Sequence, residues 1–345
     1  MTKRAAAESA NEEGASKPGH PFAPYVQAIG RGPTLSRELT EDEATTAMGM
    51  ILDGQAEPIQ LGAFLMVLRY RKETAIELAG FARAARERFV GRVAAHADLD
   101  WPSYADRHKQ LPYFVLAALL LAQNGVRVMM HGIAGSGAAT TPKVLTALGV
   151  PQSATLGEAA RRLDEANFAY VSLSNFCPDL DRLFALRPLF GLRSPANTFS
   201  REINPLNAPC QVQGIFHPTY METHIETARL LGGRDAAVFK GGGGEVQRSP
   251  EKPCRVARLT GGVASEETWG ALTPEQRYPW RDEPLDPARL LALWRGEWSA
   301  PEPEAAVIGT AAIALAVLKR AATPAAADAL AAELWRSRSR NAPGR

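Results

Sequence analysis

Apolar residues recur at helical spacing through the first part of the chain, which predicts consecutive amphipathic helices. Thr40 can cap the first helix, with Glu43 as its partner in a capping box, and Gly54 stands where that helix should end. The predicted helices are residues 39–54, 57–71 and 72–89. We therefore expect an all-helical unit near the start of the protein.

After about residue 98 the pattern changes to short apolar or β-branched runs that alternate with amphipathic helices, which is typical of a largely parallel sheet. The predicted strands are residues 126–131, 168–173, 210–216, 236–240 and 254–260. The predicted helices are residues 111–125, 141–149, 156–166, 218–233, 304–321 and 325–338. Residues 177–195 are predicted as short helices, and residues 264–289 as a long surface loop.

Composition narrows the class of protein. Hydrophobic residues make up 46% and charged residues 22% of the chain, as in globular proteins. The apolar run at residues 305–318 is too short to span a membrane, and the N-terminus lacks the apolar core of a signal peptide. The cysteines Cys177, Cys210 and Cys254 never stand in C-x-x-C spacing, so we predict neither a disulfide framework nor a zinc site. A cytoplasmic protein is expected.

Several segments resemble the anthranilate phosphoribosyltransferase superfamily, glycosyltransferase family 3. They are residues 60–69 (QLGAFLMVLR), 77–80 (ELAG), 204–209 (NPLNAP) and 214–218 (GIFHP), and the resemblance extends from about residue 39 to 334. It implies an α/β fold like that of nucleoside phosphorylases and phosphoribosyltransferases, with a small N-terminal all-helical domain and a larger α/β domain built on a mainly parallel central sheet. A homodimer joined through the helical domains, with a cleft between the two domains, is also implied.

The domain boundaries follow from the pattern and the resemblance together. We predict a disordered tail at residues 1–21 and a basic tail at residues 337–345. The helical domain is predicted at residues 22–95, with a returning helical block at 178–196. The α/β domain is predicted at residues 96–177 and 197–336.

The chain departs from the family at the segments that bind the phosphorylated donor. Residues 101–110 (WPSYADRHKQ) replace a glycine-rich loop, although glycine is what lets backbone N–H groups approach a pyrophosphate closely. A Lys-His-Gly-Asn-Arg segment has become residues 130–134 (MHGIA). The acidic pair that binds magnesium has become a lone Glu245 between Lys240 and Arg248, a poor magnesium site. We predict no bound metal, no cofactor and no catalytic residue.

These departures resemble the YbiB-type branch of the superfamily, which is described as nucleic-acid binding. Basic residues also cluster where the cleft is expected, and clustered cations can follow a phosphate backbone. We therefore predict a binder of DNA or RNA with little sequence preference, on a degenerate phosphoribosyltransferase scaffold. The predicted contact residues are Arg107, His108, Lys109, Arg187, Arg193, Arg201, Lys240, Arg248 and Lys252.

Two other functions stay open at this point. The protein could be a working pentosyltransferase in which Arg107, His108 and Lys109 have rebuilt the anion site, or a scaffold that binds an acidic segment of a partner protein. Any single arginine could be a solvated or salt-bridged surface residue. The glycines at residues 241–244 could contact phosphate or form a turn with positive φ, and His131 and His217 could bind phosphate or simply pack.

Overall fold

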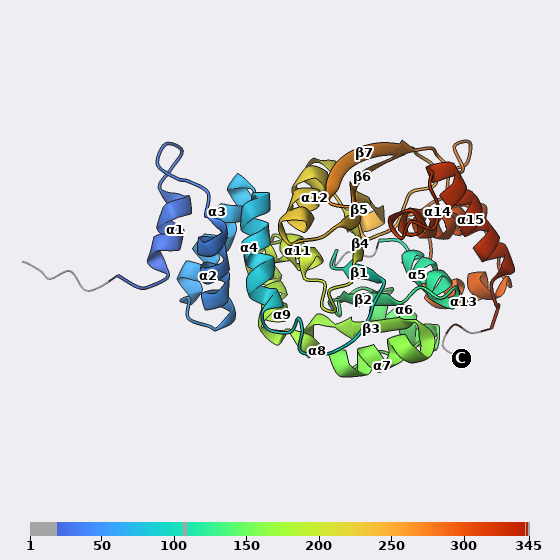
Figure 1. The fold of residues 1–345 in the computed structure, drawn as a ribbon, viewed down its shortest axis with the longest axis horizontal. Helices are drawn as coiled ribbons and strands as arrows, with labels where there is room; N and C mark the ends of the chain where they lie inside the picture. Colours follow the sequence, from blue (N-terminus) through green and yellow to red (C-terminus); the bar gives the residue numbers. More distant parts are fainter. Residues whose placement is uncertain (1–18, 106–108, 342, 344–345) are drawn as a thin grey trace, which may run out of the picture.

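The structure is a computed structural model that describes residues 19–105, 109–341 and 343. Helices gather at one end of the molecule and an α/β domain forms the rest (Figure 1). The N-terminal helices are α1 (Ala23–Gly30), α2 (Glu41–Leu52), α3 (Pro58–Arg71) and α4 (Ala75–Arg86). Residues 1–18 of the predicted N-terminal tail and residues 342, 344 and 345 of the predicted basic tail lie outside the described residues.

Local side-chain chemistry explains where these helices begin and end. The Thr40 hydroxyl accepts a hydrogen bond from the Glu43 N–H at 3.2 Å, and the Glu43 carboxylate accepts one from the Thr40 N–H at 3.0 Å. Gly54 follows the end of α2 with φ of 72°, a conformation that favours glycine. The predicted capping box and helix end are therefore confirmed.

The α/β domain is built on one seven-stranded sheet with the order β3-β2-β1-β4-β5-β6-β7. Neighbouring strands from β3 to β5 are parallel, and β6 and β7 continue the sheet in antiparallel fashion. The strands are β1 (Leu99–Ser103), β2 (Val128–Gly132), β3 (Phe168–Ser172), β4 (Cys210–Ile215), β5 (Asp235–Lys240), β6 (Cys254–Thr260) and β7 (Val263–Trp269). The predicted fold class, a small helical domain before a mainly parallel α/β domain, is confirmed.

Helices cover both faces of the sheet, and alternate strand residues pack on opposite sides (Figure 1). In β2, Met130 packs into the core shared with the C-terminal helices, whereas the adjacent Met129 packs into the core shared with the helical domain. The first core holds α5 (Phe114–Gln123), α6 (Thr141–Ala147), α13 (Ala288–Arg295), α14 (Pro301–Val317) and α15 (Pro324–Ser337). The second face carries α7 (Leu156–Ala166) and α12 (Met221–Leu230).

Short helices follow β3 and bring the chain back to the helical domain. Figure 1 shows α9 and α11 beside α4, and the rings of Phe199 and Phe81 lie 5.7 Å apart between α11 and α4. These helices are α8 (Leu173–Phe176), α9 (Pro178–Phe184), α10 (Arg187–Phe190) and α11 (Ala196–Phe199). The second core is therefore continuous from the helical domain to the sheet.

The sequence pattern did not predict two of the strands, β1 and β7. β1 was missed because it contains Pro102 and is buried at every position, so it has no alternation. Its pairing with β4 ends at Asp100, and Pro102 therefore follows the last residue that pairs on that side. β7 lies almost wholly in the segment predicted as a surface loop. It is an exposed edge strand joined to β6 by a pair of glycines, which is a hairpin signal in the sequence. None of the described helices is long and apolar enough to cross a membrane.

Candidate functional site

A cavity of about 300 Å³, here called the arginine pocket, lies where the helical domain meets the carboxyl end of β4. Among the described residues, its lining contains four arginines and no carboxylate side chain. The lining residues are Arg69, Arg187, Gly191, Leu192, Arg193, Ser194, Asn197, Thr198, Arg201, Ile215, Phe216, His217, Tyr220 and His224. A pocket of this charge favours a small anion.

A second cavity of about 640 Å³, here called the lysine pocket, adjoins it, and Phe216 lines both. Lys240 reaches it from the end of β5, Lys252 from just before β6, and Lys109 from the segment after β1. These three lysines and Arg281 are exposed. Glu251 is the one carboxylate residue that the structure describes in the lining, and it accepts hydrogen bonds from the Tyr278 N–H and Trp280 Nε1.

The position of both pockets follows from the topology of the sheet. The chain runs outward from β1 through β2 to β3, and then returns to place β4 and β5 on the other side of β1. The carboxyl ends of β1 and β4 therefore diverge from a topological switch point, where α/β proteins bind their ligands. Ile215 and Lys240 end β4 and β5 and line the pockets at this edge.

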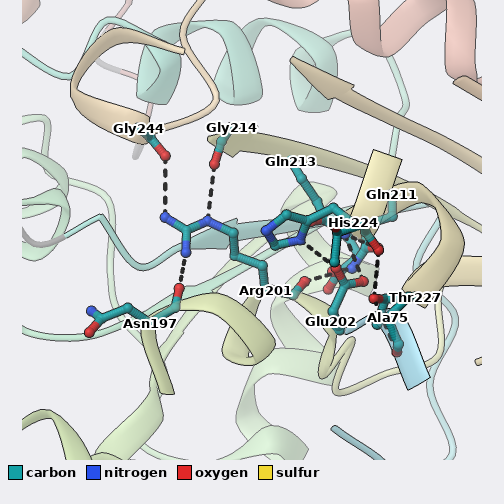
Figure 2. Close-up of polar contacts among 12 residues, drawn as sticks. Ala75, Asn197, Arg201, Glu202, Gln211, Gln213, Gly214, His224, Thr227 and Gly244 are labelled. Carbon is teal, nitrogen blue, oxygen red and sulfur yellow. Dashed lines mark hydrogen bonds and ion pairs between the residues drawn. The ribbon is translucent and has the colours of Figure 1, made fainter. Parts of the chain in front are cut away.

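Arg201 closes the floor of the arginine pocket as a fully packed cation (Figure 2). It belongs to η1 (Ser200–Glu202); its Nε donates to the Gly214 carbonyl at 3.0 Å and Nη2 donates to the Gly244 carbonyl at 3.4 Å. Nη1 donates to the carbonyl of Asn197. Burial lowers the pKa of Arg201, and the charges of Glu245 and Glu202 oppose that effect. The guanidinium thus joins three backbone segments.

A network of buried polar side chains runs beneath the pockets. His224 Nδ1 lies 2.7 Å from Glu202 Oε1, and the other oxygen of Glu202 accepts from Gln213 Nε2 at 2.8 Å. The same Gln213 nitrogen donates to Gln211 Oε1 at 2.7 Å, and Gln211 donates to Asp100 at 2.8 Å. Figure 2 shows the part of this network around His224.

The network ends at the carboxyl end of β1. His131 is fully buried, with Nε2 3.0 Å from Asp100 Oδ1 and Nδ1 2.8 Å from the Tyr104 hydroxyl. The Tyr104 ring is also buried and stacks on Phe184 with ring centroids 5.8 Å apart. His131 is therefore a packed residue and not a phosphate contact, whereas His217 is exposed and lines the arginine pocket.

The lone family carboxylate, Glu245, has an internal role. It is buried, and its Oε1 accepts a hydrogen bond from the Ala105 N–H at 2.8 Å, just after β1. Across the described ranges no group of three or more His, Cys, Asp or Glu residues is arranged to hold a metal ion. The nearby glycines form a turn, with positive φ at Gly243 and Gly244.

The structure separates the predicted contact residues into different places. Lys109, Lys240 and Lys252 come together in the lysine pocket, and Arg187 and Arg193 join Arg201 in the arginine pocket. Arg107 and His108 lie outside the described residues. The sequence did not point to Arg69, Phe216 or His224, because each comes from a different element and no motif links them.

Arg248 lines neither pocket, and its position corrects the prediction that it contacts nucleic acid. Its side chain is fully buried in the α/β domain, where Nη1 pairs with Asp328 at 2.7 Å and Nη2 donates to the Gly270 carbonyl at 2.6 Å. A buried, paired guanidinium is unavailable to a polyanion in solution. Arg201 differs from the prediction for the same reason, since its donors are bonded to backbone carbonyls inside the protein.

Comparison with known proteins agrees with this architecture. Residues 23–89 match the helical bundle domain of a glycosyl transferase family, and residues 114–277 match its α/β domain. The anthranilate phosphoribosyltransferase of Thermus thermophilus superposes with a TM-score of 0.77, covering 92% of this chain and 95% of that one at 24% identity. That likeness concerns the fold alone.

Curated relatives extend the likeness to the sequence. The anthranilate phosphoribosyltransferase of Methylocella silvestris is 33% identical over 82% of this chain and 83% of its own length. The one from Moorella thermoacetica is 31% identical over 69% and 70%, and the uncharacterized protein YbiB of Escherichia coli is 27% identical over 67% and 74%. The chain therefore belongs to the same glycosyl transferase family as these anthranilate phosphoribosyltransferases.

Proposed function

We propose that this protein is a pentosyltransferase of the phosphoribosyltransferase type, which transfers a pentosyl group from a phosphorylated donor to a small acceptor that carries a carboxylate. The observation that carries the proposal is the pair of adjoining pockets, both rich in cations and both lined by Phe216. Their position at the switch point of the sheet supports a ligand site. Relatives at 31% and 33% identity are anthranilate phosphoribosyltransferases.

The two pockets suit different parts of the reaction. The arginine pocket is the smaller, has no carboxylate among its described lining residues and includes the aromatic side chains of Phe216 and Tyr220, so it suits a small aromatic acid. The lysine pocket is larger and presents Lys109, Lys240 and Lys252 to solvent, so it suits the phosphate groups of a donor. Because Phe216 lines both pockets, a donor and an acceptor bound in them would be neighbours, and holding the two together lowers the entropic cost of their reaction.

The family resemblance implies a magnesium ion with the donor, and the described residues around the pockets do not fit one. Magnesium takes oxygen ligands in octahedral geometry, usually from one or two carboxylates and the substrate phosphates. Glu245 bonds to the Ala105 N–H, and Glu251 bonds to the Tyr278 and Trp280 nitrogens. In this proposal the lysines neutralise the donor phosphates directly.

A second function, binding of single-stranded nucleic acid, is favoured by one particular feature. Phe216 is 50% exposed and stands between the lysine pocket and the arginine pocket. An exposed aromatic ring beside lysines is the arrangement on which bases stack while cations follow the phosphates. The predicted DNA or RNA binding stays a prediction, now without Arg201 and Arg248.

One double substitution tests both functions. Replacing Lys240 and Lys252 with alanine should weaken phosphoribosyl pyrophosphate binding at least about tenfold, because a hydrogen bond to a charged group contributes about 1.5–3 kcal/mol. Isothermal titration calorimetry with the full chain, with and without magnesium, measures that affinity. Lys143→Ala/Arg336→Ala removes the same charge away from both pockets and should leave it within twofold.

The outcomes separate the two candidates. Pyrophosphate release from phosphoribosyl pyrophosphate in the presence of anthranilate, lost in the double variant, supports the transferase. No heat with millimolar phosphoribosyl pyrophosphate overturns it. Binding of labelled oligothymidylate that weakens steeply with salt and disappears in the same variant supports the nucleic-acid function instead, because neutralised phosphates release counterions.

We also propose that the chain forms a homodimer through the exposed face of α3. Ile59 and Tyr70 are 86% and 92% exposed and lie eleven positions apart, which places them on one side of the helix. Leu189, 80% exposed, extends the patch from the adjacent α10, whose Phe190 lies 3.8 Å from the place of a Cβ on Gly62. Large apolar side chains exposed together mark interaction surfaces.

Replacing Ile59 and Tyr70 with aspartate should convert the dimer to a monomer, since both charges would be buried at the interface. Light scattering coupled to size exclusion measures the mass at micromolar concentration. Val263→Asp, at a 69% exposed position in the β6–β7 hairpin, is the control and should stay dimeric. A monomeric parent protein, or a dimeric double variant, would show that the interface is not there.

A further inference from the structure

One histidine in the arginine pocket is held in place by a buried carboxylate. His224 comes from α12 and Glu202 from η1, and their exposed side-chain fractions are 2% and 1%. Nδ1 of the ring lies 2.7 Å from Glu202 Oε1, while Glu202 Oε2 accepts from Gln213 Nε2 at 2.8 Å. Bonds to both oxygens fix the carboxylate, and the carboxylate fixes the ring.

This arrangement determines which ring nitrogen can act. A carboxylate beside Nδ1 requires the proton on Nδ1, so the lone pair of the neutral ring is on Nε2. Within the described part of the chain only Nδ1 has a hydrogen-bond partner, and His224 lines the arginine pocket. Figure 2 shows the second nitrogen turned away from Glu202. The ring therefore presents an oriented proton acceptor to a ligand in that pocket.

The remaining pocket residues are less suited to accept a proton. The guanidinium groups of the four arginines donate hydrogen bonds and have no acceptor atom. His217 is exposed, and no carboxylate within the described residues orients its ring. Tyr220 is 6.5 Å from His224 between ring centroids, and its hydroxyl lies near Arg69 and Glu73 at 3.4 and 3.5 Å.

We propose that His224 is a catalytic residue that takes the proton which the acceptor loses during transfer, with Glu202 as its positioning residue. The inference rests on the proposed function. The bond between C1 of the pentose and its phosphate or pyrophosphate breaks, and the leaving group keeps the electron pair. The lone pair of the acceptor amine forms the new bond to C1, and the N–H proton passes to Nε2. Glu202 stabilises the imidazolium that forms, and solvent removes the proton after product release.

The discriminating substitution is His224→Asn. The asparagine amide can still donate a hydrogen bond to Glu202 in the place of Nδ1, but it has no basic nitrogen in the place of Nε2. We expect kcat with phosphoribosyl pyrophosphate and anthranilate to fall roughly a hundredfold or more, while KM for each changes less than about threefold. His96→Asn is the matched control, because His96 pairs with Asp98 at 2.9 Å on the exposed surface, and its rate should not change.

A second measurement tests base chemistry apart from packing. His224→Ala opens space at the pocket, and exogenous imidazole should restore part of its kcat, which a purely structural role would not allow. Glu202→Gln should lower kcat about tenfold or more with little change in KM, because the imidazolium loses its counter-charge.

The failures of the two proposals are distinguishable. If His224→Asn keeps kcat within threefold of an active parent protein, the role of His224 is wrong and the transferase function stands. If imidazole fails to restore a folded His224→Ala protein, as judged by circular dichroism, the role is also wrong. A parent protein that releases no pyrophosphate with anthranilate overturns the proposed function and this inference with it.

Discussion

Arg248→Met is expected to lower the free energy of unfolding by about 3 kcal/mol, because it removes the fully buried partner of an ion pair and leaves Asp328, whose side chain is 21% exposed, only partly compensated by solvent. The guanidinium pairs with Asp328 of α15, donates to the Gly270 carbonyl, and lies 5.0 Å from the centroid of the Trp269 ring. Methionine can fill much of the volume beside Trp269, but it cannot satisfy the carboxylate or the carbonyl. Urea unfolding followed by tryptophan fluorescence measures the change.

Arg255→Met is the matched control for this prediction. Arg255 forms an ion pair too, a bidentate one with Glu266 at 2.9 and 2.7 Å, but its side chain is 61% exposed. An exposed pair contributes about 0–1 kcal/mol, so this variant should unfold almost as the parent does. Equal stability of the two variants would show that Arg248 is not the buried, paired residue described above. Arg248→Met should not alter binding in the lysine pocket through loss of a phosphate contact, because Arg248 does not line that pocket.

Gly214→Ala is the second substitution with a large expected effect, about 2–4 kcal/mol of destabilisation, as for an overpacked core site. A Cβ at this position in β4 would stand 2.0 Å from the carbonyl carbon and oxygen of Glu245 and 2.4 Å from the nitrogen of Val246. These are backbone atoms, so no side-chain rotation relieves the contact. The strand end and the glycine turn would have to separate.

That separation should also damage the candidate site. The Gly214 and Gly244 carbonyls both accept hydrogen bonds from Arg201, and Glu245 holds the Ala105 N–H after β1. We expect phosphoribosyl pyrophosphate affinity to fall together with the thermal midpoint. Gly49→Ala, in α2 with open space around the added Cβ, should instead stabilise the protein by about 0.5–1 kcal/mol. A Gly214→Ala protein with unchanged midpoint and affinity would contradict the tight contact.

The charge of a side chain could not show which of the predicted contact residues are exposed and which are buried. Lys240 is the last residue of β5 and Arg248 stands only eight positions later, but Lys240 is exposed beside a pocket while Arg248 is buried. The difference depends on Asp328, eighty residues later, which supplies the counter-charge from α15. Burial of a cation is decided by what packs around it, and that information is not local.

What the sequence determined by itself was local: the capping box at Thr40, the end of α2 at Gly54, and the alternation of apolar runs that predicted the parallel strands other than β1. These features depend on neighbours within a few residues, so their pattern is visible along the chain. Only the tertiary structure placed His224 on Glu202 and joined the pockets through Phe216. Those contacts arise because β4 returns beside β1 and brings separate segments together at one edge of the sheet.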